Sequence, residues 1–177
     1  MISLYLNKKA RLTDLYGKPC ENETFFEMHA DNSYLRIDFT CFFKEKPKDM
    51  TAIHGKRVYR NECVELFIGN KKEYYEIDLS AYNICFTAFV ENPNSDPEPE
   101  VTETEIEGLE TDVEWADSYY IAKYKLPTVS LRRFGEKLYF NAFRVEMVNG
   151  VRVSRAVSKT NSTSHHVPEV FIPISLL

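Results

Sequence analysis

Long apolar runs and an excess of basic residues are both missing from this sequence. Its 22 lysine and arginine residues are outnumbered by 27 aspartate and glutamate residues, for a formal net charge of -5. A chain with this balance has no electrostatic footprint for a nucleic-acid backbone and no polybasic patch for anionic lipid. The opening "MISLYLNKKARL" places its lysines after the apolar segment, the reverse of a secretory signal. We therefore expect a cytoplasmic protein that binds neither nucleic acid nor membrane, and nothing in the sequence indicates an oligomeric state.

Glycine and cysteine are also scarce. With six glycines, a loop that cradles phosphate is not expected, and no nucleophile elbow, H-E-x-x-H or G-x-G-x-x-G motif occurs. The commonest enzyme signatures are thereby excluded. The four cysteines form no C-x-x-C pair, so we expect reduced thiols rather than zinc ligands or disulfides. They are Cys20, Cys41, Cys63 and Cys85. No cofactor is expected.

Apolar residues recur with a period of two along most of the chain, which favours strands over helices. The pattern is clear in "YLRIDFTCFF", "CVELFI", "YYEIDLS", "NICFTAFVE" and "KLYFNAFRVEM". In the fourth of these segments it places four apolar residues on one side, namely Ile84, Phe86, Ala88 and Val90. Short strands separated by turn residues predict an all-β antiparallel β-sandwich of the jelly-roll kind, with little helix beyond a turn near "SLRRFGE". Because no composition shift or repeat occurs, we expect a single domain over residues 1–177.

The segment 91–114 differs from the rest because it contains no lysine or arginine. Its first part, "ENPNSDPEPE", is rich in proline and predicts an exposed loop. The oxygen ligands of this loop suit calcium, although the spacing of a D-x-D-x-D-G calcium loop is missing. Further on, "VTETEIE" alternates charge with apolar residues and predicts an edge strand that resists pairing with other chains.

The stretch "RNECVELFIGNKKEYYEIDLS" collects carboxylates on one face of a predicted hairpin. If the alternate apolar residues fill the core, Glu65, Glu76 and Asp78 project from the opposite face, together with Phe67 and Tyr74. Such a face is typical of a sheet surface that meets water. It also has the chemistry of a sugar site, where carboxylates grip hydroxyls and flat rings cover a pyranose.

Two further strands are predicted to add charge to this face. By the same alternation, Arg36 and Asp38 point away from the core, as do Arg144 and Glu146 if Phe143 and Val145 are buried. Two other functions stay open for a sandwich of this kind. A small glycan-acting enzyme would pair Glu65 with Glu76, Asp78 or Glu146 as two carboxylates. A protein interaction module would instead expose an apolar patch.

Several motifs occur in an order that resembles family 9 carbohydrate-binding modules and the related DOMON-like sandwiches. They are "RNECVELFIGNKKEYYEIDLSAYN", "YYIAKYKLPTVSL", "KLYFNAFRVE" and "HHVPEVFIPISLL", and they extend from Arg60 to the end of the chain. The resemblance implies a jelly-roll-like sandwich that binds sugars without catalysis, by stacking between aromatic rings and by hydrogen bonds from charged side chains. It also implies that structural calcium is possible.

The resemblance also implies site residues. The stacking ring of the family lies six positions before the glutamate of the V-E motif, which is Tyr59 before Glu65 here. Asn141 and Arg144 match the asparagine and arginine of the family's N-F-x-R strand. The family's second ring is a tryptophan near the C-terminus, whereas the one tryptophan here lies well before that region, at position 115. The same region offers two histidines instead, His165 and His166. The predicted ligand is a mono- or oligosaccharide.

Overall fold

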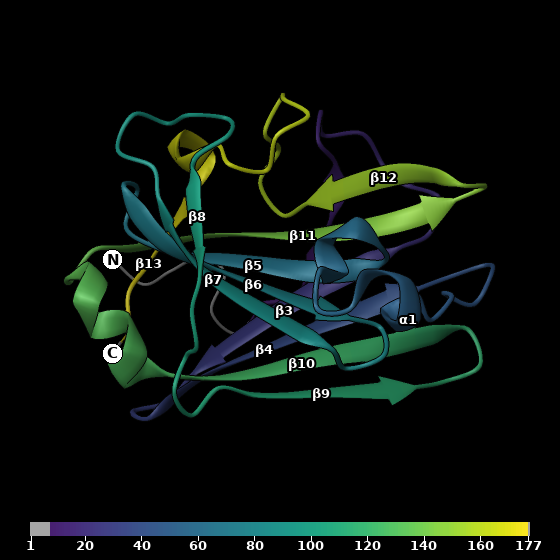
Figure 1. Ribbon diagram of the computed structural model, residues 1–177, viewed down its shortest axis with the longest axis horizontal. Coiled ribbons are helices and arrows are strands. Elements are labelled where there is room, and N and C mark those ends of the chain that lie inside the picture. Colours follow the sequence, from purple (N-terminus) through teal and green to yellow (C-terminus); the bar gives the residue numbers. More distant parts are fainter. Residues whose placement is uncertain (1–7, 177) are drawn as a thin grey trace.

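The computed structural model describes residues 8–176 and consists mainly of antiparallel strands in two sheets (Figure 1). The first sheet has five strands in the order β1-β3-β4-β10-β9. Their bounds are β1 Ala10–Arg11, β3 Thr24–Ala30, β4 Tyr34–Phe42, β10 Tyr119–Pro127 and β9 Glu110–Trp115. The three central strands, β3, β4 and β10, alternate buried side chains with more exposed ones, as the period of two predicted.

The second sheet has eight strands, seven of them in the order β2-β12-β11-β5-β6-β7-β8, while β13 pairs with β11. Their bounds are β2 Thr13–Asp14, β12 Val151–Ala156, β11 Leu138–Val148, β5 Cys63–Gly69, β6 Glu73–Ser80, β7 Cys85–Glu91, β8 Glu100–Glu103 and β13 Ile172–Ile174. The predicted edge strand is β8, which is exposed along its whole length. The all-β sandwich is confirmed.

Helix is limited to four short pieces among the described residues. They are α1 Thr51–His54, η1 Val58–Arg60, η2 Thr128–Phe134 and η3 Pro168–Val170. The turn expected near "SLRRFGE" is part of η2. Within residues 8–176, no helix is long and apolar enough to cross a membrane.

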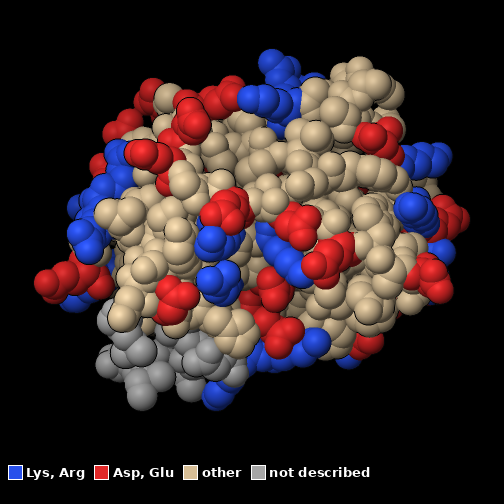
Figure 2. All heavy atoms as spheres, turned by 90° about the horizontal axis from the view of Figure 1, so that it is seen from below, with Lys and Arg blue, Asp and Glu red and all other residues tan. Residues whose placement is uncertain are grey.

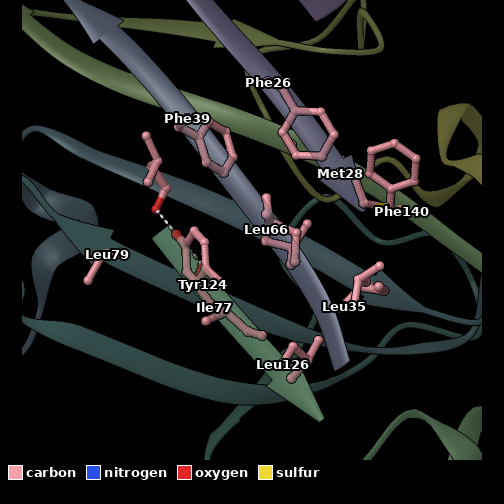
Figure 3. Packing of buried hydrophobic residues seen from close by; sticks show 14 of the residues in the cluster. Phe26, Met28, Leu35, Phe39, Leu66, Ile77, Leu79, Tyr124, Leu126 and Phe140 are labelled. Carbon is pink, nitrogen blue, oxygen red and sulfur yellow. Dashed lines mark hydrogen bonds between the residues drawn. The ribbon is translucent and has the colours of Figure 1, made fainter. Parts of the chain in front are cut away.

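The main core lies between the two sheets (Figure 3). Phe26 of the first sheet stacks on Phe140 of the second, with ring centroids 5.4 Å apart. Tyr124 extends from β10 across the core, and its hydroxyl donates a hydrogen bond of 2.9 Å to the carbonyl oxygen of Val64 on β5. This buried bond ties the sheets together and satisfies a phenol that would otherwise be costly to bury.

The centre of the second sheet is buried on both faces. Every residue of β5 is buried, and β6 is buried from Tyr74 onward. The apolar positions Val64, Leu66 and Ile77 face the main core as predicted. The opposite face of this hairpin is therefore covered by other parts of the chain and is not a solvated surface.

Burial on both faces makes two of the predicted orientations wrong. Arg144 and Glu146 do not point away from the core. They lie between the sheets, where Arg144 donates to the carbonyl oxygen of Phe42 on β4 and Glu146 accepts from Asn22. Similarly, Phe86 shares a face with Ala88 and Val90, but that face lies away from the main core. A strand that is apolar at both odd and even positions does not reveal by alternation which side faces the core.

Arg36 and Asp38 do point away from the core, but they lie on β4 in the other sheet and so do not join the face of Glu65. On the side of the molecule seen in Figure 2, acidic and basic groups are interspersed. Ion pairs such as Lys125 with Glu110 (2.7 Å) belong to the outer surface of the five-stranded sheet. Exposed pairs of this kind stabilise a fold by at most about 1 kcal/mol.

The cysteines are free thiols, as expected. Cys41 and Cys63 are buried within strands, and burial raises the pKa of each. They act as small apolar residues of the interior.

Candidate functional site

The carboxylates of the β5–β6 hairpin lie side by side on the face away from the main core. Glu65 is paired across the strands with Asp78, and Phe67 is paired with Glu76. At the end of the hairpin, a Cβ atom on Gly69 would lie 2.5 Å from the Cα atom of Tyr74, so only glycine fits there. The predicted clustering of these side chains on one face is therefore present in the structure.

A long loop covers part of this face. The chain leaves the sheet after β12 and rejoins it at β13, and both strands lie along the same edge of β11. Residues 157–171 between them fold over the hairpin. Asn141 of β11 anchors the start of this loop, because its side-chain amide donates to the carbonyl oxygen of Ser158 (2.9 Å) and accepts from the Ser158 N–H (3.0 Å). The loop that follows β7 lies beside it at the same end of the molecule (Figure 1), and the Ser164 hydroxyl donates to the carbonyl oxygen of Pro97 (2.9 Å).

These segments leave a cavity of about 540 Å³ over the hairpin. Its lining combines carboxylates, aromatic rings, hydroxyls and one guanidinium. The residues are Tyr59, Glu65, Phe67, Glu76, Phe86, Val101, Glu103, Arg152, Thr163, Ser164, His165 and His166. A cavity of this size, with apolar walls and a few convergent polar groups, is typical of a small-molecule site.

Glu65 and His165 form a buried pair at the base of this cavity. Glu65 Oε2 lies 2.6 Å from His165 Nδ1, and the imidazole stacks on Phe143 with centroids 4.3 Å apart and planes 5° from parallel. Burial alone would raise the pKa of Glu65. The charge and hydrogen bond of His165, together with Arg152 at 3.8 Å, outweigh burial and hold that pKa below its usual value. Glu65 is therefore an ionised acceptor at neutral pH.

His166 belongs to a second chain of hydrogen bonds. The Asn92 amide donates to the Tyr74 hydroxyl (3.3 Å), which lies 2.9 Å from His166 Nδ1. Because the tyrosine oxygen already accepts from Asn92, its own proton is donated to Nδ1, which leaves the imidazole proton on Nε2. Burial, and to a smaller extent the charge of His165, lower the pKa of His166 to about 4, although Glu65 opposes this shift. His166 is therefore neutral at pH 7.

Glu76 and Asp78 are buried acids without a counter-charge. No donor is within hydrogen-bond distance of Glu76 Oε2 or of either carboxyl oxygen of Asp78. Burial, and then the charge of Glu65, raise the pKa of Glu76 to about 8, and burial raises the pKa of Asp78 well above its usual value. Both carboxyl groups therefore hold a proton more tightly than an exposed carboxyl group does.

Replacing Glu76 with glutamine is expected to make stability less sensitive to pH. The folded protein binds the Glu76 proton more tightly than the unfolded chain, so this stabilisation is complete below pH 4.5 and is lost as pH rises through about 8. One pKa unit corresponds to about 1.4 kcal/mol. Between about pH 5 and pH 8, we expect the native protein to lose roughly 2–4 kcal/mol of unfolding free energy that Glu76→Gln does not lose.

Urea unfolding followed by the fluorescence of Trp115 measures this difference in unfolding free energy, with the exposed Glu110→Gln as control. An identical pH dependence in Glu76→Gln and native protein would contradict the assignment.

Aromatic rings form one wall of the cavity. Tyr59 extends from η1, just before β5, and meets Phe86 of β7 edge to face with centroids 5.5 Å apart. The two rings touch each other and so do not form the two sides of a clamp. Trp115 lies elsewhere, at the end of β9, where it packs against Tyr82 and Tyr120.

Four of the six predicted site residues meet in this cavity, namely Tyr59, Glu65, His165 and His166. The other two lie outside its lining. Asn141 is fully buried and anchors the loop 157–171, as described above. Arg144 is fully buried between the sheets, where it pairs with Glu62 at 2.6 Å.

Six lining residues were not predicted: Phe86, Val101, Glu103, Arg152, Thr163 and Ser164. For Phe86 a signal existed, because β7 follows β6 directly and the hairpin register places Phe86 opposite Asp78. Arg152 and Glu103 come from strands whose position depends on the fold of the whole chain, and no local pattern marks them.

The acidic loop after β7 is closed by its own side chains. The Asn92 Oδ1 atom accepts from the Asp96 N–H (2.6 Å), and Asp96 accepts from the Glu98 N–H (2.9 Å). Across residues 8–176, no group of three His, Cys, Asp or Glu side chains has an arrangement that could hold a metal ion. Calcium binding by this loop stays a prediction.

Comparisons with known proteins concern the fold of the chain. No protein-family model and no curated protein matches the sequence. A protein from Bacteroides uniformis ATCC 8492 that has been proposed to bind carbohydrate is 13% identical over 95% of this chain and 85% of its own, with a TM-score of 0.70.

Two other similar structures are of a family 9 carbohydrate-binding module from Caldicellulosiruptor kristjanssonii. The complex with cellotriose is 12% identical over 88% of this chain and 75% of its own, with a TM-score of 0.62. The complex with glucose is 13% identical over 89% of this chain and 78% of its own, with a TM-score of 0.58. The resemblance to DOMON-like sandwiches stays a prediction. On its similarity to these solved structures, the chain has the β-sandwich fold of family 9 carbohydrate-binding modules.

Proposed function

We propose that this protein binds a mono- or oligosaccharide non-covalently in the cavity over the β5–β6 hairpin. The observation that carries the proposal is the convergence of an ionised carboxylate, Glu65, and an aromatic wall, Tyr59 with Phe86, on one cavity of about 540 Å³. Carboxylates accept hydrogen bonds from sugar hydroxyls, and flat rings cover the apolar face of a pyranose.

The surroundings of Glu65 suit this role. Its side chain is oriented by His165 at 2.6 Å, and that ring is fixed in turn by stacking on Phe143. An acceptor held in one geometry loses little entropy when a ligand binds. The solved structures with this fold include complexes with glucose and cellotriose, which supports the choice of a saccharide as ligand.

Replacing Tyr59 with alanine is expected to remove sugar binding. Saturation transfer from the protein to a panel of mono- and disaccharides, recorded by ligand-detected NMR with and without calcium, should give a signal for at least one sugar. That signal should be lost in Tyr59→Ala, because the stacking surface is gone. Tyr16→Ala is the matched control, since Tyr16 is exposed and lies outside the cavity. Absence of transfer across the whole panel would contradict the proposal, and a calcium-dependent signal would support a calcium site.

One observation favours a glycan-acting enzyme as the second candidate. Glu65 is ionised while Glu76 keeps its proton to about pH 8, and the two line the same cavity. Glycosidases use such a pair, one carboxyl as acid and the other as nucleophile or base. Glu146, the third acid considered from the sequence, lies between the sheets and not in this cavity. Release of nitrophenol from nitrophenyl glycosides, lost in both Glu65→Gln and Glu76→Gln, would replace the binding proposal by this one.

An interaction module has less support. Among residues 8–176, the large exposed apolar side chains are spread over different elements and turns, whereas an interaction surface would gather them in one patch. They are Tyr16, Ile53, Val101, Val129, Met147 and Val151.

A further inference from the structure

The two buried carboxyl groups that line the cavity differ in their partners. Glu65 is matched by His165 at 2.6 Å and by Arg152 at 3.8 Å. No such partner exists for Glu76, and Glu103 adds a further carboxylate at the rim. Among the described residues that line the cavity, Arg152 is the one guanidinium and there is no lysine. A ligand that brings positive charge would give Glu76 the counter-charge that it lacks in the protein.

Glu76 is the position where the missing charge would bind. The side chain is buried, with 7% of its surface exposed, and its Oε2 atom has no hydrogen-bond donor although it belongs to a cavity-lining residue. His166 Nε2 lies 3.7 Å away, too far for a hydrogen bond, and its ring is neutral at pH 7. An unpartnered carboxyl oxygen in such a place indicates a donor supplied from outside the protein.

Sugar hydroxyls and ammonium groups differ in what they offer to such an oxygen. A hydroxyl donates one hydrogen bond and brings no charge, whereas an ammonium brings a full charge and three donors. A hydrogen bond between charged partners is roughly twice as strong as one between neutral partners. In a cavity that screens charge poorly, this difference is large.

Resting on the saccharide-binding function proposed above, we propose that the ligand is an amino sugar with a free amine, whose ammonium group binds Glu76 while its ring lies against Tyr59 and Phe86. The arrangement puts the charged substituent at the buried floor and the apolar face of the pyranose at the aromatic wall.

The titration of Glu76 agrees with this assignment. The pKa of its carboxyl group is raised because burial and the charge of Glu65 act without a compensating cation. An ammonium in contact with the carboxylate would lower that pKa again. Binding of an amino sugar at pH 7 should therefore release a proton from Glu76, which calorimetry in buffers of different ionisation enthalpy detects.

Three ligands that share one ring test the proposal: glucose, glucosamine and N-acetylglucosamine, titrated at pH 7 by calorimetry or NMR. At this pH an amine beside electron-withdrawing groups is mostly protonated, as an α-amino group with a pKa of about 7.7–8.0 is. N-acetylglucosamine has a substituent at the same carbon but no charge. We expect glucosamine to bind at least tenfold more tightly than glucose, and N-acetylglucosamine to show no such gain.

The ratio of the two affinities within one protein variant isolates the role of Glu76. In Glu76→Gln, the ratio of glucosamine to glucose affinity should fall from at least ten to about one, whereas the exposed Glu110→Gln should keep the native ratio. A purely structural effect of Glu76 would change both affinities together and leave the ratio unchanged, which would overturn the proposal. Glucose binding without a preference for glucosamine would overturn the amine proposal alone. Binding of none of the three sugars, nor of any other in the wider panel, would overturn the saccharide proposal and this one with it.

Discussion

Replacing Arg144 with methionine is expected to destabilise the protein by about 3–5 kcal/mol, the usual cost of removing one partner from a buried ion pair. The guanidinium is fully buried and crosses from β11 to the other sheet, where it donates to the Thr24 hydroxyl (3.0 Å) and to the carbonyl oxygen of Phe42 (2.7 Å). It also pairs with Glu62 at 2.6 Å and lies 3.5 Å from Glu146. Without it, Glu62 and the carbonyl oxygen of Phe42 would lose their charged partner in the interior, whereas Glu146 would keep its ion pair with Arg155.

The loss of unfolding free energy in Arg144→Met should also depend on pH. Burial raises the pKa of Glu62, and Arg144 opposes that rise. In Arg144→Met the pKa of Glu62 rises further, so the extra instability grows as pH increases from about 5 to about 8.

Urea unfolding at both pH values measures this effect. Arg132→Met, on the exposed side of η2, is the matched control. The double variant Arg144→Met with Glu62→Met should recover part of the stability, because it removes both partners of one pair. A loss below about 1 kcal/mol in the single variant would show that Arg144 does not join the sheets as described.

Replacing Glu65 with glutamine is expected to weaken saccharide binding by roughly 10- to 150-fold. This factor corresponds to the 1.5–3 kcal/mol of a hydrogen bond to a charged group, which glutamine cannot provide. The substitution keeps the size of the side chain but removes the charge that faces His165 and Arg152. Calorimetric titration with the tightest sugar of the panel measures the change.

A stability measurement separates this effect from damage to the fold. Because Glu65 is buried and bonded to His165, Glu65→Gln should also lower the unfolding free energy by about 1–3 kcal/mol, which leaves the protein folded at room temperature. Glu110→Gln, on the exposed face of the other sheet, should change neither quantity. Affinity within a factor of two of the native value in folded Glu65→Gln would remove Glu65 from the site.

How well the site could be predicted depended on how each strand is buried. In the β5–β6 hairpin every charged residue except Glu73, at the start of β6, lies on the same face, so Glu65, Glu76 and Asp78 could be placed together from the sequence. In β11 the residues are apolar at both parities around Arg144. The alternation there does not show which set of side chains faces the core, and Arg144 was assigned to the wrong face for that reason.

The loop residues of the site required more than periodicity. His165 and His166 were predicted because the end of the chain resembles a known family, since a loop has no repeating pattern to follow. Tyr59 was predicted from the same resemblance, which implies a ring six positions before Glu65, and η1, which contains Tyr59, leads into β5. Arg152 and Glu103 are brought to the cavity by pairing between strands distant in sequence, which no local pattern encodes.

The loop 157–171 starts and finishes on one edge of β11, held at its start by Asn141. Its two ends are therefore fixed by the sheet, while the length between them is free to vary at an entropic cost that grows only with the logarithm of loop length. Insertions or exchanges within this loop would leave the pairing register of β11 untouched. The residues that this loop contributes to the cavity can thus be exchanged while the sheet that supports the loop stays the same.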